Sequence, residues 1–267
     1  DVRIFEEAAE APLMIDYTAN KVQSRTATLA LSMNGGGGFE IWQFTSRNTE
    51  KASFDIRIGD FGLFACKIKS RDVQASYDFL KNNEVTLLNE PQKDPNGALS
   101  FFLLDPNGNI FQVLESNSWF GQTGHKSQCG GVAGSIIGVS DMEKSLVLYR
   151  DILNYDVIDY DVTGVFEDFN GLNGANRSFR RVRLSHSVER KGPFAPLLGA
   201  STMELVQVLE DSTSRKIFKN RLWGDWGFIH LCFDVQGMDA LQKQCDSLGF
   251  PFTVDSGSTF DMGEAGG

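Results

Sequence analysis

The sequence lacks a long apolar segment, a secretory leader and a basic region. No uninterrupted run of about 18 or more apolar residues occurs, so no membrane-spanning helix is predicted. Residues 1–12 are acidic from the first position, which is not the pattern of a signal peptide. The formal net charge is −10, which argues against the basic face that a nucleic-acid partner requires. We therefore expect a globular chain whose partner is a small molecule, with neither a nucleic acid nor a membrane as partner.

Cysteine is scarce as well. The four cysteines, Cys66, Cys129, Cys232 and Cys245, are widely spaced and form no Cys-x-x-Cys pair. This spacing excludes a zinc ribbon and a dense disulfide framework. Cys66 and Cys232 lie in apolar strand patterns and Cys245 in a helical pattern, so we expect buried free thiols. All four are compatible with a reducing cytoplasm, which is the compartment that we expect.

Apolar residues are abundant and occur in a repeated order. They make up 41% of the chain and include 21 phenylalanines, enough for a sizeable core. An apolar strand at 135–139 is followed by a helical pattern at 142–153, in which apolar residues recur at steps of four, three and four. The same order of strand and helix returns at 61–80 and at 227–248.

A longer repeat relates the two halves of the chain. The similar segments are 1–5 with 156–160, 25–32 with 179–185, and 38–44 with 202–208. The repeating unit is βαβββ, present four times, and it predicts an α+β fold. We expect residues 1–118 and 130–267 to form two halves of two paired units each, joined by a Ser-, Gly- and Gln-rich linker. The first unit lacks its opening strand and helix and the last lacks its closing hairpin, so we expect the sequence to be a fragment.

Three motifs carry a family resemblance. They are the hairpin FFLLDPNGNIFQVLE at 101–115, the strand and helix at 138–157, and GFIHLCFDV at 227–235. Together they resemble the vicinal-oxygen-chelate superfamily, which includes glyoxalase I, extradiol dioxygenases, epimerases and bleomycin-resistance proteins. The resemblance covers nearly the whole chain. It implies that paired βαβββ units curl into half-open barrels, each around a pocket in which strand residues bind a divalent metal.

In the second half, the resemblance implies a metal site at Glu204 and His230. Carboxylate and imidazole ligands suit Zn²⁺, Fe²⁺, Ni²⁺ or Mn²⁺. The ion would polarise a carbonyl or enolate of the substrate through its vicinal oxygens. A third expected position holds Gly134, which has no side chain to donate, so ring-cleavage chemistry is the least favoured. Glu204, like Glu40 in the first half, lies among apolar neighbours, where a carboxylate needs a metal, an arginine or hydrogen-bond donors.

In the first half, the resemblance puts Glu40 at the corresponding carboxylate position. Trp42 and Phe44 share its face of the strand and are candidates for an aromatic substrate pocket. Leu63 stands where the histidine is expected, and Gln112 stands where the last carboxylate is expected. Glu40 is then the one side chain of this pocket that could bind a metal. Because one carboxylate with a neutral amide would hold an ion poorly, we expect the pocket to be metal-free.

Several of these residues have a structural alternative. A histidine on an apolar strand is more often a hydrogen-bonded core residue than a ligand. For His230, the resemblance and the carboxylate of Glu204 make the two interpretations equally favoured. Arg181 and Arg183 alternate with Val182 beside Glu204, and they either bind an anionic substrate or face solvent, with solvent favoured. The other two histidines, His125 and His186, have no partner at ligand spacing and are assigned no function.

The leading functional hypothesis is a glyoxalase- or dioxygenase-like metalloenzyme acting on a small oxygenated metabolite. The alternative is a metal-free protein of the same fold that binds small molecules, as antibiotic-resistance proteins do. A third hypothesis is a scaffold that serves assembly alone. A homodimer is compatible with each.

Overall fold

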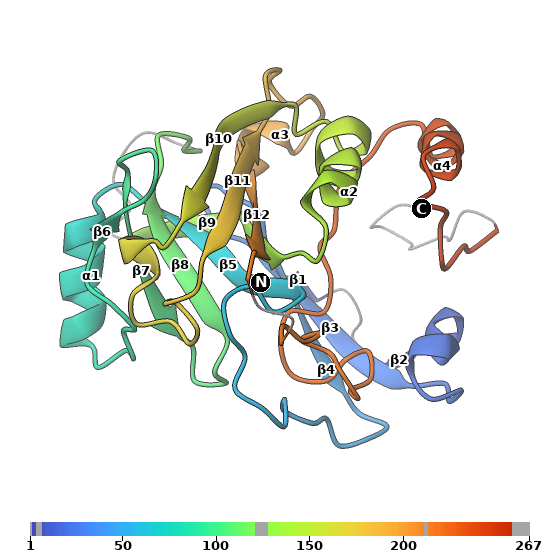
Figure 1. Cartoon of the computed structure of the whole chain (residues 1–267). Coiled ribbons are helices and arrows are strands. Elements are labelled where there is room, and N and C mark those ends of the chain that lie inside the picture. Colours follow the sequence, from blue (N-terminus) through green and yellow to red (C-terminus); the bar gives the residue numbers. More distant parts are fainter. Residues whose placement is uncertain (1, 4–6, 121–127, 211–212, 258–267) are drawn as a thin grey trace. The chain divides into compact units, whose positions relative to one another are not determined.

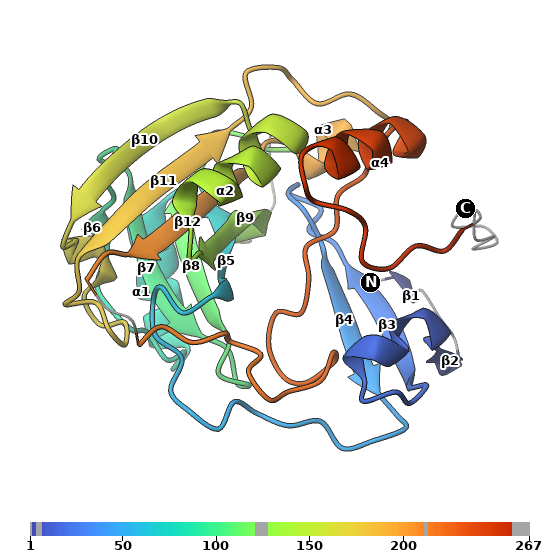
Figure 2. The same cartoon turned by 45° about the vertical axis from the view of Figure 1, so that its right-hand side comes forward.

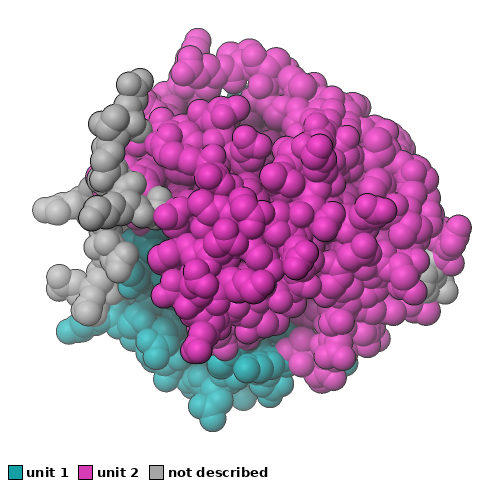
Figure 3. Space-filling view, turned by 90° about the vertical axis from the view of Figure 1, so that its left-hand side faces the viewer, with its two compact units in different colours: residues 1–30, 39–51, 220–267 teal, residues 31–38, 52–219 magenta. Residues whose placement is uncertain are grey.

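The computed structural model describes residues 2–3, 7–120, 128–210 and 213–257, so His125 lies outside the described residues (Figure 1). The chain forms two compact units, coloured separately in Figure 3. Unit 1 comprises Asp1–Ala30, Phe39–Lys51 and Asn220–Gly267, and unit 2 comprises Leu31–Gly38 and Ala52–Lys219. Both units are discontinuous in sequence. They therefore do not follow the expected halves 1–118 and 130–267.

Unit 2 is built on one eight-stranded mixed sheet, which is strongly curled (Figure 2). In spatial order its strands are β10 (Val157–Gly164), β11 (Phe179–Ser185), β12 (Thr202–Val208), β9 (Cys129–Gly138), β5 (Gly62–Ser70), β8 (Ile110–Glu115), β7 (Leu99–Leu104) and β6 (Gln92–Lys93). Helix α1 (Val73–Asn82) packs on β7 and β8, and helix α2 (Met142–Leu146) packs on β12. A π-helical segment, Val147–Ile152, continues α2, and α3 (Ala195–Leu198) and a short 3-10 helix, Glu167–Phe169, lie in the connections.

This sheet contains two complete βαβββ modules. One consists of β5, α1 and β6 to β8, and the other of β9, α2 and β10 to β12. The expected α+β fold and its repeating module are thus confirmed. The modules join through β5 and β9, which pair antiparallel, so the second and third repeats share a sheet. We expected the first repeat to pair with the second. That expectation was wrong because the alternation of apolar and polar residues shows which face of a strand is buried, but does not show which other module the strand pairs with.

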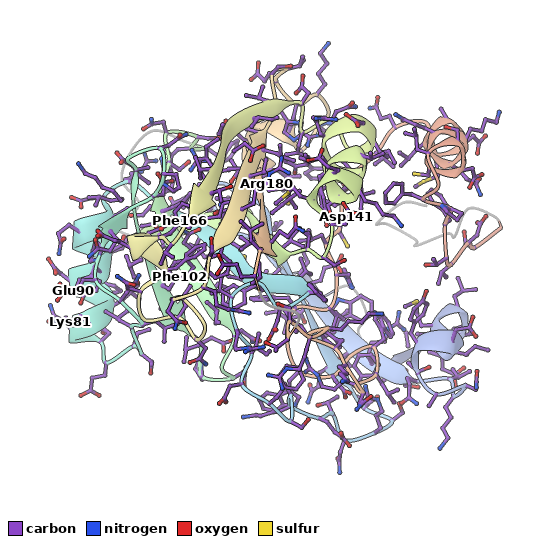
Figure 4. All side chains as sticks on the ribbon, viewed as in Figure 1. Lys81, Glu90, Phe102, Asp141, Phe166 and Arg180 are labelled. Atoms are coloured by element: carbon purple, nitrogen blue, oxygen red, sulfur yellow. The ribbon has the colours of Figure 1, made fainter. Side chains whose placement is uncertain are left out.

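One apolar cluster of unit 2 lies on the sheet face that carries Phe102, and a second, with Phe101 and Tyr77, lies where α1 packs on the sheet. Phe169 contacts Phe102 and Phe179 edge to face, with ring centroids 6.3 and 5.6 Å apart. Phe166, labelled with Phe102 in Figure 4, is partly buried against the same cluster. Such aromatic pairs each add about 0.5–1.5 kcal/mol beyond the area that they bury. The buried members of the first cluster are Ile58, Phe64, Ala65, Phe102, Ile136, Phe169, Leu172, Phe179, Val206 and Ile217.

Unit 1 contains a smaller antiparallel sheet. Its central strand β3 (Ser24–Ala30) pairs with β1 (Val2–Arg3), β2 (Ala9–Glu10) and β4 (Phe39–Phe44). A 3-10 helix, Pro12–Tyr17, and helix α4 (Met238–Ser247) complete its regular structure within the described residues.

The last repeat is only partly formed. Helix α4 confirms the helical pattern after residue 237, but residues 227–235 form no strand. A strand needs a neighbour to satisfy its backbone hydrogen bonds, and no strand of the described chain pairs with this segment. The apolar alternation alone was therefore an insufficient signal. None of the helices in the described ranges has both the length and the apolar composition required to cross a membrane.

Candidate functional site

Strand β4 positions Glu40 in unit 1. Its antiparallel register places Glu40 opposite Leu29 and Trp42 opposite Ala27. Residues two apart on a strand share a face, so the Glu40 and Trp42 side chains lie on the same side of the sheet. The indole Nε1–H of Trp42 donates a hydrogen bond to Glu40 Oε2 at 3.2 Å. This bond orients the carboxylate.

His230 meets the same carboxylate. Its Nε2 lies 3.0 Å from Glu40 Oε2, and its ring stands edge-on to the ring of Trp42 with centroids 5.7 Å apart. The side chains of His230 and Glu40 are 31% and 30% exposed, so small solutes can reach them. Contacts with Cys232 and with Glu40 raise the pKa of His230 to about 9, and the His230 hydrogen bond lowers the pKa of Glu40. Without an ion, the pair is an imidazolium beside a carboxylate.

Cys232 completes this cluster. Its Sγ lies 3.6 Å from Glu40 Oε2, and one donor atom from each of Glu40, His230 and Cys232 lies within 4.8 Å of the others. Cys232 is exposed, contrary to the burial expected from its apolar neighbours, because this segment joins no sheet. The sequence did indicate that Cys232 lies beside His230, since residues two apart in an extended segment point to the same side.

The loop that precedes His230 packs on β4. Trp223 contacts the rings of Trp42 and Phe44 edge to face, each with centroids 5.3 Å apart. Gly224 has φ +89°, and a Cβ there would lie 2.0 Å from Phe44 Cε2, so only glycine fits. The buried carboxylate of Asp225 accepts hydrogen bonds from two backbone N–H groups. Of the two predicted substrate contacts, Phe44 is buried under this loop, and Trp42 lies half-buried beside Glu40 and His230.

Glu204 has different partners. It belongs to unit 2 and is 1% exposed, and its Oε2 lies 2.7 Å from Lys67 Nζ while its Oε1 lies 2.8 Å from Arg181 Nε. Burial alone would raise the pKa of Glu204, but Arg181 and Lys67 hold it well below its usual value. Both carboxylate oxygens are therefore bound to cations of the protein. The predicted ligand pair of Glu204 and His230 is divided between the units, and His230 has Glu40 as its carboxylate.

The two arginines predicted to bind substrate, Arg181 and Arg183 on β11, are likewise bound to carboxylates. Arg181 is fully buried, contrary to the favoured solvent position, and it forms a two-point ion pair with Asp168 at 2.7 and 2.9 Å. Arg183 is mostly buried and contacts Asp94 at 2.6 Å and a second aspartate at 2.9 Å. The neighbouring Arg180, labelled in Figure 4, lies on the opposite, more exposed face of the strand, as period-two alternation requires.

Other predicted positions in unit 2 have structural explanations. Gly134 has φ +139°, and a Cβ there would lie 1.8 Å from the carbonyl oxygen of Thr202, so the close approach of β12 requires glycine. Gln112 is buried and donates a hydrogen bond to Ser100 Oγ at 3.0 Å. The sequence interpretation missed Lys67, which stands opposite Gln112 in the parallel β5–β8 register. Its signal was a lysine inside an apolar strand, which demands a buried partner.

Comparison with known proteins gives one family match and several distant structural likenesses. Residues 7–113 match the family model of the Glyoxalase/Bleomycin resistance protein/Dioxygenase superfamily. Glyoxalase I from Zea mays is 14% identical over 71% of this chain and 55% of that chain, with a TM-score of 0.37. A putative dioxygenase from Bacillus subtilis is 15% identical over 71% of this chain and 52% of that chain, with a TM-score of 0.41. Methylmalonyl-CoA epimerase from Streptomyces coelicolor is 15% identical over 56% of this chain and 98% of that chain, with a TM-score of 0.31.

No curated protein matches the sequence. The matches to the maize and Bacillus structures span little more than half the length of those chains. At these identities and TM-scores, the likenesses carry no argument about activity. The evidence for the fold is the family model and the two complete βαβββ modules. Over residues 7–113, less than half of its length, the chain is thus similar to the Glyoxalase/Bleomycin resistance protein/Dioxygenase superfamily, and its two complete modules have the βαβββ order of that fold.

Proposed function

We propose that this protein is a metal-dependent enzyme of the glyoxalase or dioxygenase type, which acts on a small oxygenated metabolite at unit 1. The observation that carries the proposal is the contact between Glu40 Oε2 and His230 Nε2, 3.0 Å apart on partly exposed side chains. A carboxylate and an imidazole that converge at a reachable surface fit a divalent ion. Such an ion, when bound, supplies a Lewis acid that polarises a substrate carbonyl.

Each residue of the site has a distinct role in this proposal. Glu40 and His230 hold the ion. Trp42 fixes the rotamer of Glu40 through its indole hydrogen bond, and its ring forms an apolar wall for the substrate beside the ligands. His230 must lose its proton when it binds the ion, because a ligating imidazole is neutral. Glu204, Arg181 and the other buried ions of unit 2 take no part, since they are bound to one another.

The test is the metal content of the purified protein and its variants. We expect one equivalent of Zn²⁺, Fe²⁺, Ni²⁺ or Mn²⁺ in the wild type, and loss of this ion in His230→Ala and Glu40→Gln. His186→Ala is the matched control, because it removes another histidine, from unit 2, and should leave the ion in place. A folded wild type that binds none of the four ions at millimolar concentration contradicts the proposal.

In that case the second candidate, a metal-free small-molecule binder, is favoured by one observation. The guanidinium of Arg25 lies 4.8 Å from the ring centroid of Trp42, whose ring also contacts Trp223. Arg25 is buried and donates hydrogen bonds to the carbonyl oxygens of Ala9 and Glu10. It therefore supports the ring of Trp42, and this half-buried indole suits an aromatic ligand. A panel of such compounds, scored by the rise in melting temperature, would detect it, since a ligand that binds only the native state raises that temperature.

A further inference from the structure

We propose that Cys232 is a third ligand of the ion in unit 1. The centre is then a thiolate, an imidazole and a carboxylate, and it selects Zn²⁺ and the similar ions Fe²⁺, Co²⁺ and Ni²⁺ over Mn²⁺ and Mg²⁺. This inference rests on the proposed function, because it needs an ion at Glu40 and His230. It goes further by naming a ligand that the sequence interpretation had assigned to the core, and by narrowing the class of ion.

The separations between donor atoms support this assignment. Ligands at about 2.1 Å (oxygen or nitrogen) and 2.3 Å (sulfur) from Zn²⁺, at a tetrahedral angle, lie roughly 3.4–3.6 Å from one another. Cys232 Sγ lies 3.6 Å from Glu40 Oε2, and His230 Nε2 lies 3.0 Å from the same oxygen. All three donor atoms fall within 4.8 Å. Shifts of a few tenths of an ångström would therefore bring the Cys232–Glu40 and His230–Glu40 pairs to the separations expected around a bound ion.

The environment of the thiol also fits this role. Cys232 is the exposed cysteine of the four, whereas Cys66 and Cys245 are buried and Cys129 is partly buried. An exposed thiol beside a histidine and a glutamate is open to an ion from solvent. Binding removes the thiol proton, because the thiolate is the form that coordinates a metal. Thiolate ligands favour zinc-type ions, whereas oxygen donors favour Mg²⁺ and Mn²⁺.

Cobalt substitution provides the test, because a thiolate bound to Co²⁺ gives an intense near-ultraviolet charge-transfer band that oxygen and nitrogen ligands do not. We expect this band in the wild type and in Cys245→Ala, which removes the other cysteine of unit 1, and we expect its absence in Cys232→Ser. In Cys232→Ser the Zn²⁺ affinity should fall at least about tenfold, since loss of even a supporting residue costs that much. The Mn²⁺ affinity should change much less.

A second measurement needs no variant. Iodoacetamide should alkylate Cys232 in the ion-free wild type, and saturating Zn²⁺ should slow this reaction markedly. A cobalt complex that lacks the thiolate band, or unchanged alkylation in the presence of bound Zn²⁺, overturns the Cys232 assignment and leaves the proposed function intact. A wild type that binds no ion overturns both.

Discussion

Replacing Glu204 by glutamine removes one negative charge from a network that solvent does not reach. Lys67 and Arg181 carry the two positive charges of this network, and Glu204 and Asp168 carry the two negative charges. All four side chains are at most 2% exposed. Glu204→Gln keeps the size and shape of the side chain. It leaves a net positive charge in the interior of unit 2.

The expected cost follows from this burial. Breaking a buried ion pair by neutralising one partner destabilises a protein by about 3–5 kcal/mol, because the remaining charge stays desolvated. A domain of 150–250 residues loses about 2–4 °C of melting temperature per kcal/mol, so the transition of unit 2 should fall by roughly 6–20 °C. Exposed ion pairs contribute about 1 kcal/mol at most to the free energy of unfolding. The measured loss of stability therefore distinguishes a buried network from an exposed one.

Calorimetry and urea unfolding followed by circular dichroism measure this loss. The matched comparison is the double variant Lys67→Met with Glu204→Leu, which removes a positive and a negative charge together. It should be more stable than Glu204→Gln, because the remaining pair of Arg181 and Asp168 is neutral. A loss below about 1 kcal/mol in Glu204→Gln, or a double variant less stable than that single one, refutes the reasoning.

The same pair of proteins has a pH signature. The folded-state pKa of Glu204 is depressed, so its stabilisation is complete above the unfolded value of about 4.3 and declines as the pH falls below that value. Glutamine does not titrate. The stability difference between wild type and Glu204→Gln should therefore shrink as the pH falls below about 4.3. A constant difference between neutral and acidic pH would contradict the ionised state of the buried carboxylate.

Two further predictions concern the site in unit 1. Trp42→Phe removes the hydrogen bond to Glu40 Oε2 and keeps a ring beside His230, so the Zn²⁺ affinity should fall about tenfold in a competition titration. An unchanged affinity would show that the indole does not position the carboxylate. Because the pKa of His230 is about 9 without an ion, protons compete with the metal, and the Zn²⁺ affinity should rise with pH until about pH 9. Calorimetry at several pH values should show proton release on binding, and an affinity independent of pH would contradict this.

The elements of the fold follow from local patterns, whereas their pairing does not. The hairpin at 99–115 and the helices at 73–82 and 238–247 match the expected turn residues and apolar spacing. These signals act between residues close in sequence. The joining of β5 to β9 depends on the mutual fit of two sheet edges, which neither segment encodes alone.

The site shows the same division. The sequence interpretation paired His230 with Glu204. Glu40 and Glu204 occupy equivalent positions in the repeat, so their positions alone do not distinguish the two carboxylates. Their surroundings do, because Glu204 contacts Lys67 and Arg181 whereas Glu40 contacts His230. Residues 40 and 230 are 190 positions apart, so their contact depends on the tertiary structure of unit 1.

The divided sequence of unit 1 has a consequence for the order in which the protein is made. The 190 residues between Glu40 and His230 require roughly 10–40 s of translation at about 5–20 residues per second. The segment Ala52–Lys219, which carries the whole eight-stranded sheet, leaves the ribosome before His230. We therefore expect unit 2 to fold first. Strands β3 and β4 can complete unit 1 only after Asn220–Gly267 has been synthesised. An ion could then bind to Glu40, His230 and Cys232 only after residue 232 has left the ribosome.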